Sequence, residues 1–236
     1  MRNKDKKRMV IFSGAGMSAE SGLKTFRDNG GLWENHRVEE VATPQAWASN
    51  PQLVLDFYNM RRSQLLKSEP NKAHEIIASW EDQFDLKVIT QNIDNLHERA
   101  GSKDVLHLHG ELLKVRSEED PDRIYHWEED LKLGDHCEKG TQLRPHVVWF
   151  GESVPMMAIA EKEVREADIF ITIGTSLNVY PAASLVNCIA EHTQCYLIDP
   201  KIPRLNFPDK WTLIQDTAYK GLKQVGNLLK KEKETI

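Results

Sequence analysis

Short apolar runs alternate along this chain with longer amphipathic segments, and this alternation constrains the fold more than any other feature. After a first run at residues 9–12, it predicts buried strands at residues 86–90, 105–108, 169–173, 195–198 and 211–214. It predicts helices at residues 70–83, 94–100, 155–166, 181–191 and 217–231. Strands that alternate with helices form a parallel sheet covered on both faces. We therefore expect an α/β, Rossmann-like fold.

Two segments interrupt this alternation. Residues 30–67 carry aromatic side chains in mostly helical patterns, with Pro44 and Pro51 at plausible helix starts. Residues 113–144 are polar and strongly charged, and their run SEEDPD cannot supply a hydrophobic core. We expect a cleft where these segments meet the sheet, because ligands bind in such concave places.

Residues 9–27, MVIFSGAGMSAESGLKTFR, join the first apolar run to a glycine turn and a segment that could start a helix. Glycine lets the backbone come close to a ligand, and the free N–H groups of a helix start favour anions. A GxG turn alone is weak support, because small residues between strand and helix are common and the full dinucleotide pattern is missing. Phe26 and Arg27 follow, and an arginine here suggests a loop that closes over a polyanion.

Taken with four later stretches, this segment resembles the sirtuin family of NAD-dependent protein-lysine deacylases. The stretches are TQNIDNLHERAG at residues 90–101, LHLHGELLKVR at 106–116, RPHVVWFGE at 144–152 and IGTSLNVYPAASL at 173–185. They occur in the family order and span nearly the whole chain. The resemblance implies an NAD-binding, Rossmann-like domain of residues 1–29, 68–112 and 145–236. It also implies a small inserted domain, made of a helical module at residues 30–67 and a zinc-less module at residues 113–144.

Polar and small residues follow the predicted strands at their carboxyl ends, where open parallel sheets bind ligands. Without the resemblance, Asn92 or Asp94 could equally cap a helix, and residues 174–176 could be an ordinary turn. The family more often has asparagine in place of Asp199. The resemblance assigns NAD to Gly14, Ala15, Gly16, Ser18, Phe26, Arg27, Gln91, Asn92, Ile93, Asp94, Gly174, Thr175, Ser176, Asn178, Asp199 and Ala218.

His109 stands just after the predicted strand at residues 105–108 and before Gly110. A lone histidine is more often structural or solvated than catalytic. The resemblance nevertheless implies that His109 is the general base, for which an unperturbed pKa near 6.5 is suitable. It further implies that Asn92 and Asp94 hold the nicotinamide amide and ribose. The products would be free lysine, nicotinamide and O-acyl-ADP-ribose.

Tyr58 and Arg61 lie three residues apart on a predicted helix at residues 52–66 and therefore share a face. Most helical arginines are solvated, and we expect this of the neighbouring Arg62. A phenol and a guanidinium in an acyl pocket would instead suit a carboxylate, which arginine can bind with two parallel hydrogen bonds. The pair resembles that of the sirtuin branch that removes succinyl and malonyl groups, and Ala42 matches the small residue that widens its pocket. We expect acidic acyl groups to be preferred, with deacetylation as a lesser activity.

The stretch at residues 147–152, VVWFGE, is predicted to be extended and on its own would be a core strand. In sirtuins the matching segment pairs with the extended substrate backbone by strand addition. The resemblance therefore assigns substrate binding to Val148, Phe150, Gly151 and Glu152. The expected partners are flexible acyl-lysine segments of other proteins.

Structural zinc, which most sirtuins bind through four cysteines, is not expected here. Ser117 stands at the place of the first cysteine, and residues 113–144 contain only Cys137, whereas tetrahedral zinc needs four ligands. His126 and His136 have no standard ligand spacing. We expect packing to hold the module together, around Ile124, Tyr125, Trp127, Leu131 and Leu133.

Bulk properties bound the other functions. The chain has 236 residues, of which 40% are hydrophobic, and a net charge of −5, which gives no reason to expect a nucleic-acid partner. No apolar run reaches the roughly 18 residues of a membrane span, and the basic leader is too short for a secretory signal. Three cysteines cannot form a disulfide framework, which fits a reducing cytoplasm.

Two alternative functions stay open. An ADP-ribosyltransferase would use the same NAD site, but it would not need the carboxylate pocket that Tyr58 and Arg61 suggest. A non-catalytic NAD-binding module is disfavoured because His109, Asn92 and Asp94 are all present.

Overall fold

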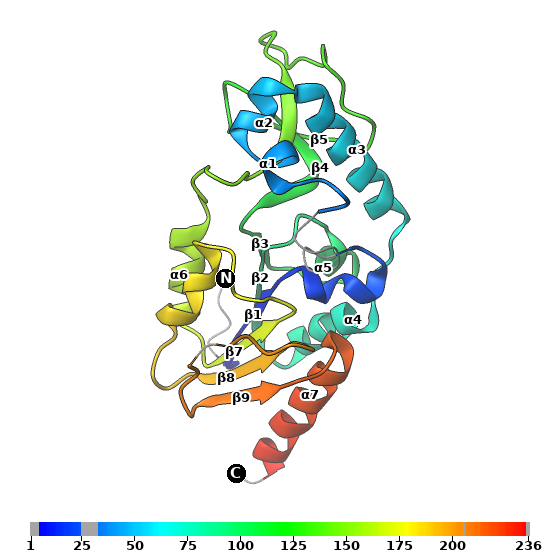
Figure 1. Cartoon of the computed structure of the whole chain (residues 1–236). Helices are drawn as coiled ribbons and strands as arrows, with labels where there is room; N and C mark the ends of the chain where they lie inside the picture. Colours follow the sequence, from blue (N-terminus) through cyan, green and yellow to red (C-terminus); the bar gives the residue numbers. More distant parts are fainter. Residues whose placement is uncertain (1–4, 25–32, 205, 235–236) are drawn as a thin grey trace.

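Six parallel strands form the larger of two sheets in the structure, a computed structural model that describes residues 5–24, 33–204 and 206–234 (Figure 1). The strand order is β3-β2-β1-β7-β8-β9, and every neighbouring pair is parallel. The sequence prediction of all six strands is confirmed to within one or two residues. Their bounds are β1 Arg8–Ser13, β2 Asp85–Thr90, β3 Val105–His107, β7 Ile169–Ile173, β8 Gln194–Ile198 and β9 Trp211–Ile214.

The sheet is buried on both faces, which is why its strands read as continuous apolar runs. Successive side chains of a strand point to opposite faces. Met9 and Ile11 of β1 accordingly belong to one core cluster, whereas Val10 and Phe12 belong to another. The prediction of a Rossmann-like parallel sheet covered on both faces is confirmed.

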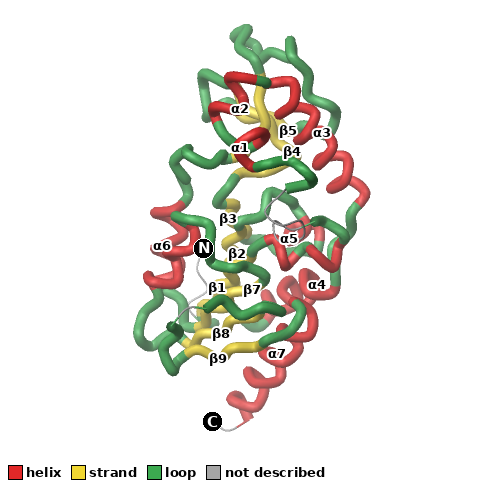
Figure 2. The backbone as a smooth tube through the Cα atoms, in the orientation of Figure 1, coloured by secondary structure: helices red, strands yellow, loops and turns green. Residues whose placement is uncertain are grey.

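Helices cover the two faces of the sheet. Figure 2 shows α6 (Met157–Arg165) on one side of the strand layer, and α4 (Lys72–Ser79) and α7 (Ala218–Glu234) on the other. A single 3-10 turn, Trp80–Asp82, extends α4. The helix predicted at residues 181–191 is instead a 3-10 helix, Ala182–Cys188, and the helix predicted at residues 94–100 shortens to α5, Leu96–Arg99.

A smaller module lies beyond the carboxyl edge of this sheet (Figure 1). Its helices are α1 (Val38–Val41), α2 (Pro44–Ser49) and α3 (Pro51–Lys67). Its antiparallel sheet has the order β5-β4-β6, with bounds Ile124–His126, Gly110–Ser117 and Leu143–Val147. Pro44 and Pro51 occupy first helical positions as predicted, behind the capping side chains of Thr43 and Asn50.

Arg62 contradicts the expectation that it is solvated, because only 1% of this residue is exposed. Its Nε donates to the Leu112 carbonyl at 3.2 Å, and its Nη1 donates to Asn59 Oδ1 at 2.7 Å and to the Glu129 carbonyl at 3.2 Å. Burial lowers the pKa of Arg62 to about 10. Arg62 therefore connects α3 to Leu112 of β4 and to Glu129, which follows β5.

The packing predicted for residues 113–144 is correct in part. Leu131 is fully buried, and Tyr125 and Trp127 pack against the module core. Ile124 and Leu133 are 43% and 50% exposed, so their assignment to the core is wrong. Ile124 is exposed because alternate residues of β5, an edge strand of the small sheet, face outward.

Hydrogen bonds among small polar side chains connect the end of β4 to the following turn. Thr141 Oγ1 lies 2.6 Å from Ser117 Oγ and 3.0 Å from Cys137 Sγ.

Within the described residues, no group of three or more histidine, cysteine, aspartate or glutamate side chains is arranged to bind a metal ion. Among the same residues, no helix is long and apolar enough to span a membrane.

Candidate active site

A cavity of about 420 Å³ lies between the carboxyl edge of the six-stranded sheet and the smaller module. The strand order places it at a topological switch point, because the chain continues from β1 to β2 on one side and β7 pairs with β1 on the other. Most of the predicted site residues line this cavity. They are Gly14, Ala15, Gly16, Ser18, Ala42, Tyr58, Arg61, Gln91, Asn92, Ile93, Asp94, His109, Val148, Phe150, Gly151, Glu152, Gly174, Thr175, Ser176, Asp199 and Ala218.

Three predicted residues are not among those that line the cavity. Phe26 and Arg27 lie outside the described residues. Asn178 is exposed and is not among the residues that line the cavity. The preceding residue, Leu177, is buried and has a positive φ of 56°.

Two glycine turns, one after β1 and one after β7, pack directly against each other. The Gly16 N–H donates to the Gly174 carbonyl at 2.8 Å. A Cβ added at Gly16 would lie 2.7 Å from Gly174 Cα, and Gly174 itself has a positive φ of 63°. Close backbone contact therefore requires glycine at both positions. The expected helix start after Gly16 is instead a pair of 3-10 turns that end at Gly22, which has a positive φ of 85°.

Ser18 connects the two polar residues that follow β2. Asn92 Nδ2 donates to Ser18 Oγ at 3.1 Å, and Ser18 Oγ donates to Asp94 Oδ2 at 2.9 Å. Asp94 Oδ1 also accepts from the Leu96 N–H at 3.2 Å, so Asp94 contacts the start of α5 while lining the cavity. Burial raises the pKa of Asp94, and the hydrogen bonds from Leu96 and Ser18 oppose that rise.

His109 follows β3, and its ring lies against the end of β2. Its Nδ1 lies 3.0 Å from the Gln91 carbonyl, which can only accept, so Nδ1 carries the proton. In the neutral ring Nε2 therefore keeps its lone pair. Burial lowers the pKa of His109 below 6.5, and the hydrogen bond to Gln91 partly offsets this. At neutral pH the ring is accordingly unprotonated at Nε2 and able to accept a proton.

Gln91 and Thr175 connect the ends of β2 and β7, because Gln91 Nε2 donates to Thr175 Oγ1 at 3.1 Å. At the far end of the cavity, Asp199 follows β8 and is 1% exposed. Its Oδ1 accepts from the Lys201 N–H at 2.8 Å. Ala218, the first residue of α7, also lines the cavity. Residues from three separate strand ends thus form one continuous edge.

Tyr58 of α3 is fully buried at the end of the cavity that the smaller module forms. Its hydroxyl accepts from Trp149 Nε1 at 3.1 Å. The guanidinium of Arg144 stacks on the Trp149 ring, 3.3 Å from the ring centroid. Burial raises the pKa of Tyr58, which keeps the phenol protonated. Within the described residues its O–H has no hydrogen-bond acceptor.

Arg61 lies one turn further along α3, and 7% of this residue is exposed. Its Nη1 lies 3.2 Å from Glu34 Oε1, and its guanidinium lies 5.4 Å from the centroid of the Trp33 ring. Its Nε is buried and has no hydrogen-bond partner within the described residues. Burial lowers the pKa of Arg61, with the carboxylates of Glu34 and Asp94 opposing. Arginine nevertheless remains charged in proteins.

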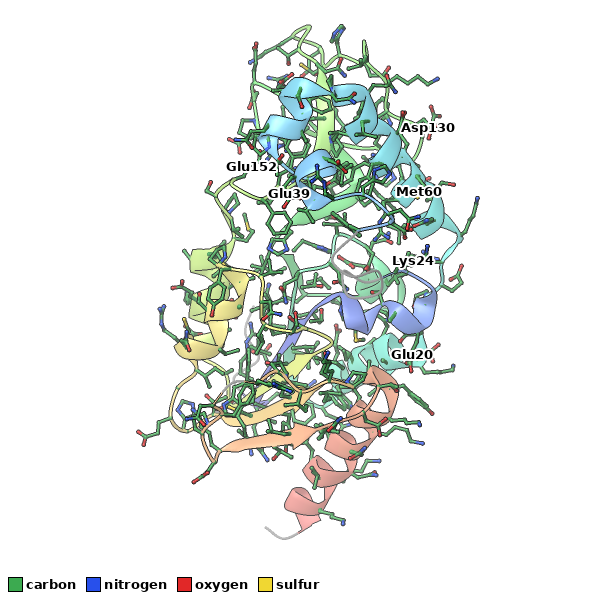
Figure 3. All side chains as sticks on the ribbon, viewed as in Figure 1. Glu20, Lys24, Glu39, Met60, Asp130 and Glu152 are labelled. Atoms are coloured by element: carbon green, nitrogen blue, oxygen red, sulfur yellow. The ribbon has the colours of Figure 1, made fainter. Side chains whose placement is uncertain are left out.

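The stretch at residues 147–152 differs from its prediction, because the strand β6 ends at Val147. The Val148 N–H donates to the His109 carbonyl at 2.9 Å, and the Phe150 N–H donates to the Ala42 carbonyl at 3.0 Å. Gly151 then turns the chain with a positive φ of 92°. The side chain of Glu152, labelled in Figure 3, accepts from Arg144 Nη1 at 2.7 Å, so an internal ion pair engages it. These tertiary contacts, which the local sequence does not reveal, replace the predicted strand.

Trp33, Trp149 and Lys24 are among the cavity residues that the sequence analysis did not assign to the site. Glu34 was also missed, although it pairs with both Lys24 and Arg61. For Trp149 a signal existed, since a buried indole N–H needs a partner and Tyr58 was already a candidate. For Glu34 no local signal existed, because its contact with Arg61 spans 27 residues.

Comparisons with known proteins agree with this geometry. A family model described as the Sir2 family matches residues 14–181. An NAD-dependent protein deacylase of Helicobacter pylori strain J99 is 53% identical over 219 residues, which make up 93% of this chain and 94% of that relative. A solved structure of a Sir2 homologue in complex with NAD is 39% identical, has a TM-score of 0.85, and covers 95% of this chain and 90% of that one.

A further solved structure is similar at lower identity. It is a complex of Sir2 with a p53 peptide and NAD, with 29% identity and a TM-score of 0.76. The match covers 93% of this chain and 92% of that one.

Proposed function

The chain belongs to the Sir2 family and is an NAD-dependent protein deacylase, and we propose that it prefers lysines that carry acidic acyl groups, succinyl and malonyl, over acetyl-lysine. The preferred partners are flexible acyl-lysine segments of other proteins. The peptide bound in the Sir2 complex supports a protein segment as the substrate.

The observation that carries the acyl preference is a pair of unused hydrogen-bond donors at the module end of the cavity. The buried Nε of Arg61 and the O–H of Tyr58 both lack an acceptor within the described residues. A buried donor without a partner costs roughly 1–3 kcal/mol, so a ligand that supplies an acceptor is favoured. A carboxylate supplies two acceptor oxygens and a charge that matches Arg61. An acetyl methyl group supplies neither.

Ala42 supports the same preference through space. It is 2% exposed, lines the cavity, and has a side chain of one carbon. A larger residue here would narrow the region between Tyr58 and the turn at Phe150, whose N–H donates to the Ala42 carbonyl. A succinyl group, which is longer than acetyl by two carbons, needs that room.

The residues at the carboxyl edge of the sheet and NAD have separate roles in the proposed reaction. Bound NAD would supply a ribose that loses nicotinamide and accepts the acyl group. His109 accepts a proton at Nε2, because Gln91 fixes the proton at Nδ1. Asn92 and Asp94, held by Ser18, orient the nicotinamide and its ribose. The two packed glycine turns would hold the phosphates, because their backbone can approach a ligand closely without a side chain in the way.

A matched series of peptides tests the acyl preference. One peptide sequence would carry acetyl-lysine, butyryl-lysine or succinyl-lysine, and kcat/KM would be measured at saturating NAD. Succinyl and butyryl have the same chain length, so their comparison isolates the terminal carboxylate. We expect kcat/KM for succinyl to exceed that for butyryl by about tenfold or more. Equal values for the two would refute carboxylate recognition, whatever the value for acetyl.

The pH dependence tests the role of His109. Because burial lowers the pKa of His109, the ring is neutral at pH 7 and becomes protonated only as the pH falls below 6.5. We expect kcat/KM for the acetyl peptide, which has no titrating acyl carboxylate, to fall on the acid side with a midpoint below pH 6.5. A midpoint clearly above 6.5 would mean that another group limits the reaction.

A further inference from the structure

Glu34 occupies an unusual place in a tight turn beside Arg61. Trp33 and His36 exchange two backbone hydrogen bonds, of 2.8 and 3.0 Å, across a two-residue turn formed by Glu34 and Asn35. Both turn residues have positive φ values, 49° for Glu34 and 68° for Asn35. Asparagine tolerates this region, but glutamate rarely adopts it. A strained residue of this kind persists only where its surroundings hold it, and such residues cluster at functional sites.

The side chain of Glu34 points into the protein, although a turn residue would ordinarily project into solvent. Only 5% of the side chain is exposed. One carboxylate oxygen lies 3.2 Å from Arg61 Nη1, and the other lies 3.1 Å from Lys24 Nζ. The buried carboxylate of Glu34 is thus shared by two cations, at the same guanidinium that the proposed function assigns to an acyl carboxylate.

We propose that Glu34 is a specificity-determining residue. Its carboxylate pairs with Arg61 when no acidic acyl group is bound, and it weakens the binding of an acidic acyl group at Arg61. The inference rests on the proposed function only in taking Arg61 as the site of the acyl carboxylate. With Glu34 present, Arg61 has a counterion even beside a neutral acyl chain, so acetyl-lysine is tolerated. The carboxylate of a succinyl group that binds Arg61 would be repelled by the Glu34 carboxylate, which pairs with the same guanidinium. This repulsion weakens the binding of the succinyl group.

Glu34→Gln tests this directly, because glutamine keeps the size of the side chain and its hydrogen-bonding oxygen but removes the charge. We expect the ratio of kcat/KM for succinyl-lysine to that for acetyl-lysine to rise by about tenfold, the effect of one charge interaction in a partly buried site. Most of the change should be a lower KM for the succinyl peptide, with kcat nearly constant. A role in folding alone would change both substrates equally and leave the ratio unchanged.

Glu39→Gln is the matched control. Glu39 lies on α1 of the same module and is exposed, and in Figure 3 it lies apart from Lys24. Its replacement removes the same charge from a side chain that, within the described residues, makes no ion pair with Arg61, so the ratio should stay within about twofold of the wild type.

The outcomes separate this inference from the proposed function. If the wild type prefers succinyl and Arg61→Met abolishes that preference, but Glu34→Gln leaves the ratio unchanged or lowers it, the inference about Glu34 is overturned alone. If the wild type shows no preference and Glu34→Gln creates one, the inference stands and the proposed preference fails. If neither Glu34→Gln nor Arg61→Met alters the ratio, both are overturned.

Discussion

Replacing His109 by alanine is expected to lower kcat for deacylation by about a thousandfold, within the range for a general base. The His109 ring is held by the Gln91 carbonyl with Nε2 free to accept a proton, and alanine offers no group that could replace it. NAD affinity should change by less than about threefold, because the proposed phosphate and ribose contacts come from the glycine turns, Asn92 and Asp94.

Single-turnover rates with saturating NAD and calorimetric binding of NAD would give the two quantities separately. His126→Ala is a suitable control, since His126 is an exposed histidine on β5, away from the cavity. If His109→Ala lost NAD binding and deacylation to the same extent, His109 would be a structural residue, and another group would have to be the base.

Arg61→Met is expected to lower kcat/KM for the succinyl peptide by about a hundredfold, as for the loss of one partner from a buried charge pair. Methionine keeps an unbranched apolar side chain at this position but has no donor for a carboxylate. Activity on the acetyl peptide should stay within about threefold, because an acetyl group makes no ionic contact with Arg61. The measurement is steady-state kinetics on both peptides with the same enzyme preparation.

The variant also leaves Glu34 without its arginine partner, which can lower stability. The ratio of the two activities is independent of the folded fraction, so it remains interpretable. Arg165→Met, at an exposed arginine of α6, controls for the loss of a positive charge. A parallel fall in both activities would mean that Arg61 supports the fold of the module and does not select the acyl group.

The six-stranded sheet was predictable because each of its strands can be recognised from a short stretch of sequence. Strands buried on both faces need continuous apolar runs, and β1, β7 and β8 have them. The alternation with helices then fixed a parallel sheet, and the strand ends placed Asn92, Asp94 and His109 at one edge. The boundaries of α5 and the 3-10 geometry after Pro181 depend on tertiary contacts and were not predictable in the same way.

The smaller module was less predictable because its contacts are long-range. Arg62 reads as a surface residue on a helix pattern, yet it binds carbonyls 50 and 67 residues away in the sequence. Just after the strand ends at Val147, the Phe150 N–H donates to the carbonyl of Ala42, a residue far away in the sequence that no local pattern links to it. Glu34 is the extreme case, since both its backbone conformation and its partner Arg61 follow from the assembled module.

Equilibrium binding, separated from catalysis, tests the central claim most directly. The inactive His109→Ala protein would be titrated calorimetrically, with NAD present, with the succinyl-lysine peptide and with the butyryl-lysine peptide, and the titrations repeated with His109→Ala/Arg61→Met. The account predicts that the succinyl peptide binds His109→Ala about tenfold or more tightly than the butyryl peptide, and that this difference disappears in the double variant. Equal affinities for the two peptides in His109→Ala would contradict it.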